Sequence, residues 1–356
     1  MSAAVSRPLS TSVRSGAGTG INTGMSTGML HTAGQRVAVH GSQSVVRALL
    51  DAADGPERPG LAADPPNVVL AVEDTREPFG TRGAELITRG VWATPGGEAV
   101  LTNVGGSGFD QRWAVDVDGL RVASRRRPSY RESAAARLLP ARQHALNSQV
   151  LLHYPALWFA MQQGFAPLHV SIVEVGGVVA LLAGPGGVGK STLVARALAD
   201  GCRATCDNLA VCDGATAYGV AEPLRLLDGT GRRALHGRRE QPWTHRVRSL
   251  PPELVVVLRR GTQDLPELHE LGPAAAARRL VAGTYAAGEL RRFWSIAALV
   301  ATATGCGPVH PPIEKVADRL TTRLPAVELI LGREPGAGLT ELLRRPLAAI
   351  RTGRAG

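Results

Sequence analysis

Apolar and polar positions are unevenly distributed along the first part of the chain. Residues 1–35 are mainly Ser, Thr and Gly, with almost no large apolar side chains. Such a segment cannot bury enough surface to offset the entropy lost on ordering, so we expect it to be disordered. A short amphipathic helix is predicted at 44–53, and a linker rich in Pro and Gly at 54–67. The first ordered strand is therefore expected at 68–72.

Residues 84–123 show the short alternating pattern of β-strands. A strand is predicted at 99–104. Two more, at 113–117 and 120–124, flank Asp118-Gly119, a dipeptide typical of a two-residue hairpin turn. These residues therefore predict a β-rich unit.

Helical periodicity follows. One helix is predicted at 134–139 and a second at 148–163. Asn147 is a candidate N-cap for the second helix, Pro155 is expected to kink it, and Gly164 is well placed to end it.

From residue 169 onward, short apolar runs alternate with helical stretches. Two runs at 170–175 and 178–183 flank Gly176-Gly177 and predict a β-hairpin. The second run leads into a Gly-rich segment and a helix at 192–199, closed by Gly201. The remaining elements are strands at 204–207, 209–212, 254–258 and 327–331, and helices near 273–286, 289–303 and 339–350.

This mixture predicts an α/β protein, with α+β as the close alternative. No internal repeat is found. We expect four parts: a low-complexity extension and linker at 1–66, a small β-rich N-terminal subdomain at 67–168, a core at 169–335, and a C-terminal helix and tail at 336–356.

Composition excludes several classes of protein. No apolar run reaches the roughly 18 residues that a membrane span requires, and no secretory signal is seen at the N-terminus. A cytoplasmic protein without a membrane partner is the expectation. The four cysteines are too few for a disulfide scaffold, and Cys202, Cys206 and Cys212 lack the tight pairs of a zinc site. We expect them to be buried as small apolar residues.

The chain is basic, with a formal charge of +10. Of its 40 Lys and Arg residues, two are Lys (Lys190 and Lys315) and the remaining 38 are Arg. Abundant Ala, Gly, Arg and Pro are typical of GC-rich coding, so the charge does not by itself indicate a nucleic-acid partner. Arg clusters at 125–131 and 232–239 are expected to be solvated surface. The alternative is a docking patch for an acidic peptide or for nucleotide phosphates.

The Gly-rich segment fits the pattern of a phosphate-binding loop, the Walker A motif. Glycines let successive backbone N–H groups turn toward phosphate oxygens, and the following helix offers its N-terminus. A Lys supplies the compact cation and a Ser the hydroxyl for Mg²⁺. The chain uses Arg almost everywhere else, yet it has Lys at this position. A planar guanidinium would be a poor substitute for the compact ammonium that the loop needs. The predicted binding residues are Gly184, Pro185, Gly186, Gly187, Val188, Gly189, Lys190, Ser191 and Thr192.

An acidic residue follows this loop at a useful position. Asp207 lies 17 residues after Lys190, at the end of the strand predicted after the loop helix. A carboxylate there can hold Mg²⁺ or accept a proton from an attacking hydroxyl. A strand-end turn residue is the competing interpretation.

Residues 169–212 resemble the HPr kinase/phosphorylase family, whose core is similar to that of phosphoenolpyruvate carboxykinase. The shared order is a His, a β-hairpin, the phosphate-binding loop, a helix, a Gly and a strand carrying acids. The resemblance implies a mixed-sheet P-loop kinase core. It also implies that Lys190 and the loop amides hold the phosphates of ATP, that Ser191 holds Mg²⁺, that Asp207 is the general base, and that His169 lies near the phosphates.

The chain departs from the family at the second acid, where it has Asn208. Asn keeps an oxygen ligand but loses a charge, so the implied metal set is Ser191, Asp207 and Asn208 with weaker binding. Glu222 lies in a segment that follows the acidic strand in the family and can extend this set. The C-terminal elements with which the family recognises HPr are not evident.

The chain looks closer to shorter HPr-kinase-like proteins found with peptide natural-product pathways. The leading hypothesis is thus an ATP- and Mg²⁺-dependent kinase acting on a Ser/Thr hydroxyl of a peptide or protein, or on a small molecule. A catalytically weak nucleotide-binding sensor or scaffold and a nucleic-acid-associated ATPase are the alternatives, with nucleic acid less favoured because few aromatics interleave the basic clusters. A homo-oligomer is left open.

Overall fold

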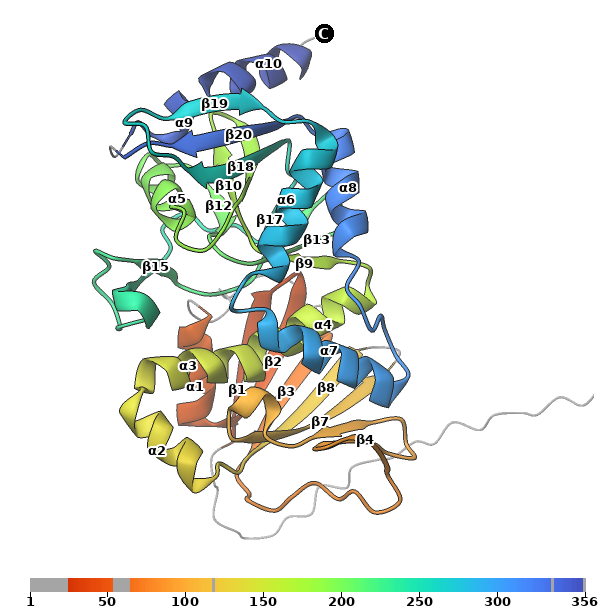
Figure 1. The fold of residues 1–356 in the computed structure, drawn as a ribbon. Helices are drawn as coiled ribbons and strands as arrows, with labels where there is room; N and C mark the ends of the chain where they lie inside the picture. Colours follow the sequence, from red (N-terminus) through yellow and green to blue (C-terminus); the bar gives the residue numbers. More distant parts are fainter. Residues whose placement is uncertain (1–24, 54–64, 117–118, 334–335, 355–356) are drawn as a thin grey trace, which may run out of the picture.

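The computed structural model describes residues 25–53, 65–116, 119–333 and 336–354 of the 356-residue chain. These residues form two large β-sheets with both parallel and antiparallel strands, two small sheets, and helices that cover the large sheets. In Figure 1 the sheet built from the N-terminal half lies in the lower part of the molecule and the second large sheet in the upper part. The predicted α/β class is confirmed.

The lower sheet has eight strands in the spatial order β1-β2-β3-β8-β7-β6-β5-β4. Strands β2, β3 and β8 are parallel, and all other neighbours are antiparallel. Parallel neighbours need a crossover, and helix α1 (Gln43–Ala52) follows β2 for that reason. The strands are β1 (Met25–Thr32), β2 (Gln35–Ser42), β3 (Val68–Glu73), β4 (Glu85–Thr88), β5 (Val91–Ala93), β6 (Ala99–Leu101), β7 (Phe109–Asp116) and β8 (Gly119–Arg126).

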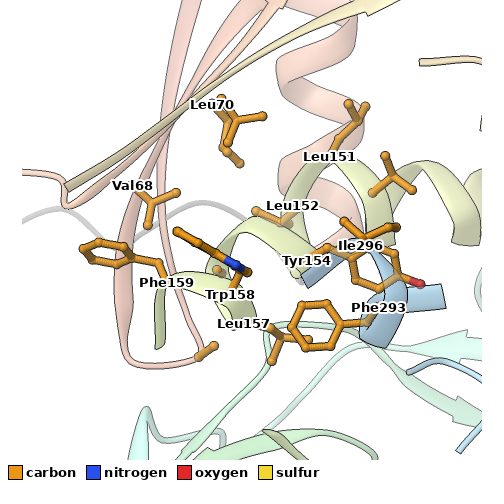
Figure 2. Close-up of a cluster of buried hydrophobic side chains, with 14 of the residues drawn as sticks. Val68, Leu70, Leu151, Leu152, Tyr154, Leu157, Trp158, Phe159, Phe293 and Ile296 are labelled. Atoms are coloured by element: carbon orange, nitrogen blue, oxygen red, sulfur yellow. The ribbon is translucent and has the colours of Figure 1, made fainter. Parts of the chain in front are cut away.

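Two helices far apart in the sequence cover this sheet. Helix α4 (Tyr154–Gln162) packs against β2, β3 and β8, and α7 (Arg291–Thr304) packs against β4 to β7. Between them lies an aromatic core, part of which Figure 2 shows. Trp158 meets Trp113 edge to face with ring centroids 5.8 Å apart, and Tyr154 lies 5.5 Å from Phe293. Trp158, Phe159 and Phe293 are buried in this core, and Trp294 is partly buried against it.

The upper sheet has six strands in the order β12-β10-β11-β18-β20-β19. Strands β11, β18 and β20 are parallel, whereas β10, β12 and β19 are antiparallel to their neighbours. Separate apolar clusters cover its two faces. One includes α6 (Pro273–Tyr285) and α8 (Ile313–Arg323), and the other includes α5 (Lys190–Ala199), α9 (Leu339–Leu342) and α10 (Arg344–Arg354). The strands are β10 (Val170–Val175), β11 (Val178–Ala183), β12 (Ala204–Cys206), β18 (Leu254–Arg260), β19 (Glu267–Glu270) and β20 (Ala326–Leu331).

The other elements connect or cover these two sheets. The four-stranded small sheet has the order β17-β14-β13-β9, and β15 pairs with β16 as a hairpin. The helices are α2 (Tyr130–Leu138), α3 (Pro140–Ser148), α5 (Lys190–Ala199), α6 (Pro273–Tyr285), α8 (Ile313–Arg323), α9 (Leu339–Leu342) and α10 (Arg344–Arg354). The small strands are β9 (Ala166–Leu168), β13 (Ala210–Cys212), β14 (Ala217–Gly219), β15 (Leu224–Leu226), β16 (Arg239–Gln241) and β17 (Ser249–Leu250).

The predicted disorder of residues 1–35 is wrong for 25–35. These residues form β1 and the start of β2, an antiparallel hairpin. Small residues are needed there because α1 packs directly on the strand. A Cβ on Gly28 would lie 2.8 Å from Cδ1 of Leu50 and 2.9 Å from Cγ1 of Val46. Ordered structure therefore precedes residue 68, while residues 1–24 and most of the predicted linker lie outside the described residues.

The helix predicted at 148–163 also starts differently. Asn147 is not its N-cap but lies inside α3, where its side chain accepts a hydrogen bond from Gln143. A five-residue π-helical turn (Gln149–His153) then leads into α4. Pro155 is in the first turn of α4, where a missing N–H costs little, so the irregularity falls before the proline. Gly164 follows the helix with a positive φ of 84°.

Other boundaries differ in smaller ways. Strands β7 and β8 pair as predicted, with Asp116 opposite Gly119, while Asp118 lies outside the described residues. The predicted C-terminal helix is two helices, α9 and α10, interrupted at Leu343. The four-part division of the chain stays a prediction. Its boundary at 168 is crossed by the lower core, which includes side chains of α7 such as Phe293.

Candidate functional site

The Gly-rich loop follows β11 and runs directly into α5. Gly187 and Gly189 have positive φ values of 80° and 119°, which a side chain would disfavour. A Cβ on Gly184 would lie 2.8 Å from the carbonyl oxygen of Leu258, so glycine is required where the loop passes β18. Gly186 and Gly187 are exposed with open space around them. The loop therefore presents its backbone to solvent at the N-terminus of a helix, as anion binding requires.

Lys190, the first residue of α5, is held against this loop. Its ammonium donates hydrogen bonds to the carbonyl oxygens of Gly184 (2.7 Å) and Pro185 (3.3 Å). The side chain is 6% exposed. Burial lowers the pKa of Lys190 to about 8, although the carboxylates of Asp207 and Glu289 act in the opposite direction. The cation is thus desolvated and held by the carbonyl oxygens of the Gly-rich loop.

Asp207 lies beside this lysine and the first helical turn. The residue is 3% exposed, and the Ser171 hydroxyl donates a hydrogen bond of 2.7 Å to its backbone carbonyl, which ties it to β10. Burial and then the charge of Glu222 raise the pKa of Asp207 to about 6. A hydrogen bond with Ser191 and the cations of Arg225 and Lys190 act in the opposite direction. A carboxyl with such a pKa can gain or lose a proton near neutral pH.

The side chain of Asn208 contacts a buried carboxylate, that of Glu222. Its Nδ2 donates to Oε1 of Glu222 at 3.0 Å, and Arg225 binds the other oxygen at 2.6 Å. Burial alone would raise the pKa of Glu222, but Arg225, His153 and the Asn208 donor outweigh it, so this pKa lies below its usual value. Glu222 therefore carries a negative charge next to Asn208.

His169 is buried at the start of β10. Its backbone N–H donates to Oγ1 of Thr284 at 3.2 Å, and Nδ1 of its ring lies 3.3 Å from the carbonyl oxygen of Gly283. Burial and then the neighbouring Lys190 ammonium lower the pKa of His169, so the ring is neutral at pH 7. It also hydrogen-bonds with Asn208. The structure thus brings His169, Lys190, Ser191, Asp207 and Asn208 into one cluster.

The remaining predicted loop residues frame this cluster. Val188 is buried and its N–H bonds to the carbonyl of Pro185 at 3.3 Å, which closes the turn. Thr192 is exposed in the first turn of α5.

Two charged residues at the site were missed by the sequence analysis. Arg260 ends β18, and its Nη2 would lie 3.6 Å from a Cβ placed on Gly189. Burial lowers the pKa of both Lys190 and His169, and the carboxylate of Glu289, just before α7, partly opposes that shift. A signal existed for Arg260, because β11 and β18 are parallel and the carboxyl ends of parallel strands share one edge of the sheet. Nothing in the local sequence marked Glu289.

No protein-only metal centre is found among the described residues, since they contain no group of three or more His, Cys, Asp or Glu placed to hold an ion. Ser191 hydrogen-bonds with Asp207, and Asn208 follows Asp207 in the chain, so their side chains lie near one another. The cysteines are free, with Cys206 and Cys212 buried as predicted but Cys202 and Cys306 only partly so. None of the helices in the described part is long and apolar enough to cross a membrane.

Comparisons with known proteins add little to this geometry. No protein-family model matches the chain, and no curated protein does either. Among solved structures, the HPr(Ser) kinase/phosphatase from Coxiella burnetii overlaps with 53% of this chain and 93% of its own, at 12% identity and a TM-score of 0.27. A TM-score this low carries no argument about function, and any assignment of activity must depend on the chain's own residues.

Proposed function

We propose that this protein is an ATP- and Mg²⁺-dependent phosphotransferase of the HPr-kinase-like type, with a mixed-sheet P-loop kinase core. Its acceptor would be a hydroxyl, either a Ser/Thr hydroxyl of a peptide or protein or one on a small molecule. One observation carries the proposal: a buried carboxyl with a pKa of about 6, Asp207, adjoins Ser191 and Lys190 where the Gly-rich loop enters α5.

The residues present fit a nucleotide and its metal. The open backbone at Gly186 and Gly187 and the desolvated Lys190 would hold phosphate oxygens, with Arg260 as a second cation beside Gly189. Bound Mg²⁺ would neutralise phosphate charge, and Ser191, Asp207 and Asn208 would supply its protein oxygens. Asn208 lacks the negative charge of an acid, and the adjacent carboxylate of Glu222 would supply it.

In the proposed reaction, one proton would move from the acceptor hydroxyl to Asp207. As the acceptor oxygen bonds to the γ-phosphorus of ATP, its proton would pass to the carboxylate of Asp207, and ADP would leave with the electrons of the broken P–O bond. Lys190 would stay charged throughout, since its pKa of about 8 lies above neutral pH. The neutral His169 would orient Asn208 rather than exchange a proton.

Incubation with γ-labelled ATP, Mg²⁺ and a panel of Ser/Thr peptides and small hydroxyl compounds tests the proposal. We expect label on at least one acceptor with the wild-type protein and none with Lys190→Ala. An absence of transfer to every acceptor, with ATP bound normally, would contradict it.

One observation favours a second candidate, a nucleotide-binding sensor with weak or no turnover. Asn208 stands where the HPr kinase family has an acid, and Glu222 is held by Arg225 rather than left free for a metal. This candidate predicts tight ATP binding without transfer. It also predicts that Asn208→Asp creates or strongly raises phosphoryl transfer. If the wild type is already an active kinase, the same substitution should change the transfer rate little.

A further inference from the structure

A basic cavity lies at the other end of the molecule from this site. Its volume is about 610 Å³, and it lies where β8 ends and α2 begins. In Figure 1, α2 is in the lower part of the molecule and α5 in the upper part. The residues lining the cavity are Arg76, Arg126, Arg127, Pro128, Ser133, Ala136 and Arg137.

Most of the positive charge in this cavity is not neutralised. Arg127 forms an ion pair with Asp110. In the described part of the chain, by contrast, no carboxylate forms an ion pair with Arg76, Arg126 or Arg137. Residues 121–142 contain seven Arg and one Glu. That Glu, Glu132, is engaged in the capping box of α2 with Ser129. Three guanidinium groups are therefore available for an anionic partner.

Helix α2, beside the cavity, is largely exposed to solvent. Helix α2 buries none of its residues, and helices of this length are marginal without packing. Tyr130 is 90% exposed, Leu138 80% and Leu139 49%. At 3.6 residues per turn, Leu138 lies about 80° around the helix from Tyr130, and Arg137 lies about 20° from Tyr130 on the other side. Exposed apolar side chains thus adjoin the arginines of the basic cavity.

We propose that this surface docks an acidic segment of another polypeptide. Carboxylates of the segment would pair with Arg76, Arg126 and Arg137, and separate aliphatic or aromatic side chains would cover Tyr130 and Leu138, one at each end of α2. The cavity is large enough for several side chains. Aliphatic side chains beside a single exposed aromatic suit a peptide better than a nucleic acid, which is bound mainly through stacked aromatics. This inference goes beyond the proposed activity and does not depend on it.

Fluorescence anisotropy with the full-length protein tests the inference. The probe is a short labelled peptide of Glu and Asp interspersed with Leu, and the competitor is single-stranded oligothymidylate of similar charge. The pocket variant is Arg126→Gln/Arg137→Gln. The matched control is Arg344→Gln/Arg345→Gln, which removes the same charge from two exposed arginines of α10.

We expect the pocket variant to bind the peptide about tenfold more weakly and the control to stay within about twofold of wild type, since close charge pairs contribute on that scale. Leu138→Gln should also weaken binding, and a Gln/Asn version of the peptide should not bind. Equal losses in the two double variants, no binding at all, or stronger binding of oligothymidylate would overturn the inference. None of these measurements requires ATP, so a failure here is distinct from a failure of the proposed activity.

Discussion

At neutral pH, where the buried carboxyl of Asp207 is ionised, it should destabilise the folded protein. Its pKa rises from 3.8 to about 6 on folding, chiefly because burial disfavours the charged form. A shift of about two units corresponds to about 3 kcal/mol. The folded state holds this proton more tightly than the unfolded chain does. The stability it contributes is therefore fully present below pH 3.8 and is lost as pH rises through about 6.

Replacing the carboxyl by an amide should remove this dependence. With Asp207→Asn, the difference in unfolding free energy between wild type and variant should change by about 2 kcal/mol between about pH 4.5 and pH 7.5. The variant gains in relative stability toward high pH, where the wild-type group is ionised. An Asn side chain is close in size and still bonds to Ser191, so packing is little disturbed.

Urea unfolding at a series of pH values measures this difference, with Asp200→Asn as the control. Asp200 is an exposed carboxyl just after α5, so its replacement controls for the loss of a surface carboxylate. A flat difference for Asp207→Asn, within about 0.5 kcal/mol over this range, would refute the assignment of a raised pKa.

Three further outcomes are expected. Leu30→Ala should lower the free energy of unfolding by about 2–4 kcal/mol in urea, because Leu30 is 2% exposed in β1, whereas Met25→Ala at a 67% exposed position should have almost no effect. Lys190→Arg should weaken ATP binding by calorimetry about tenfold or more, since a planar fork does not fit between the loop carbonyls; wild-type affinity would contradict this. Arg260→Gln should weaken ATP binding several-fold in the same titration, and the exposed Arg278→Gln should not; equal effects would exclude a phosphate role for Arg260.

Local signals predicted the centre of the candidate site well. The hairpin around Gly176-Gly177, the loop and its helix are formed by residues adjacent in sequence, and turn glycines report such geometry directly. Asp207 follows the same strand–helix–strand unit, so its approach to Ser191 could be anticipated. Their chemical roles remain predictions.

Features that depend on distant packing were missed. The strand β1 contains few large apolar residues because α1 lies close against Gly28, and composition alone indicated disorder there. Arg260 and Glu289 reach the site only through the parallel pairing of β11 with β18 and through the loop before α7. Short strands such as β9 and β14 contain only three residues each, too few to show a period.

The central claim is that Asp207 accepts the proton of an acceptor hydroxyl at this loop. Its most direct test is transfer from γ-labelled ATP by wild type and Asp207→Asn side by side, with ATP affinity measured for both. The account predicts transfer by the wild type, a loss of at least about a hundredfold in the variant, and ATP affinities of the same order. Equal transfer by the two proteins, or ATP binding without any transfer by the wild type, would contradict it.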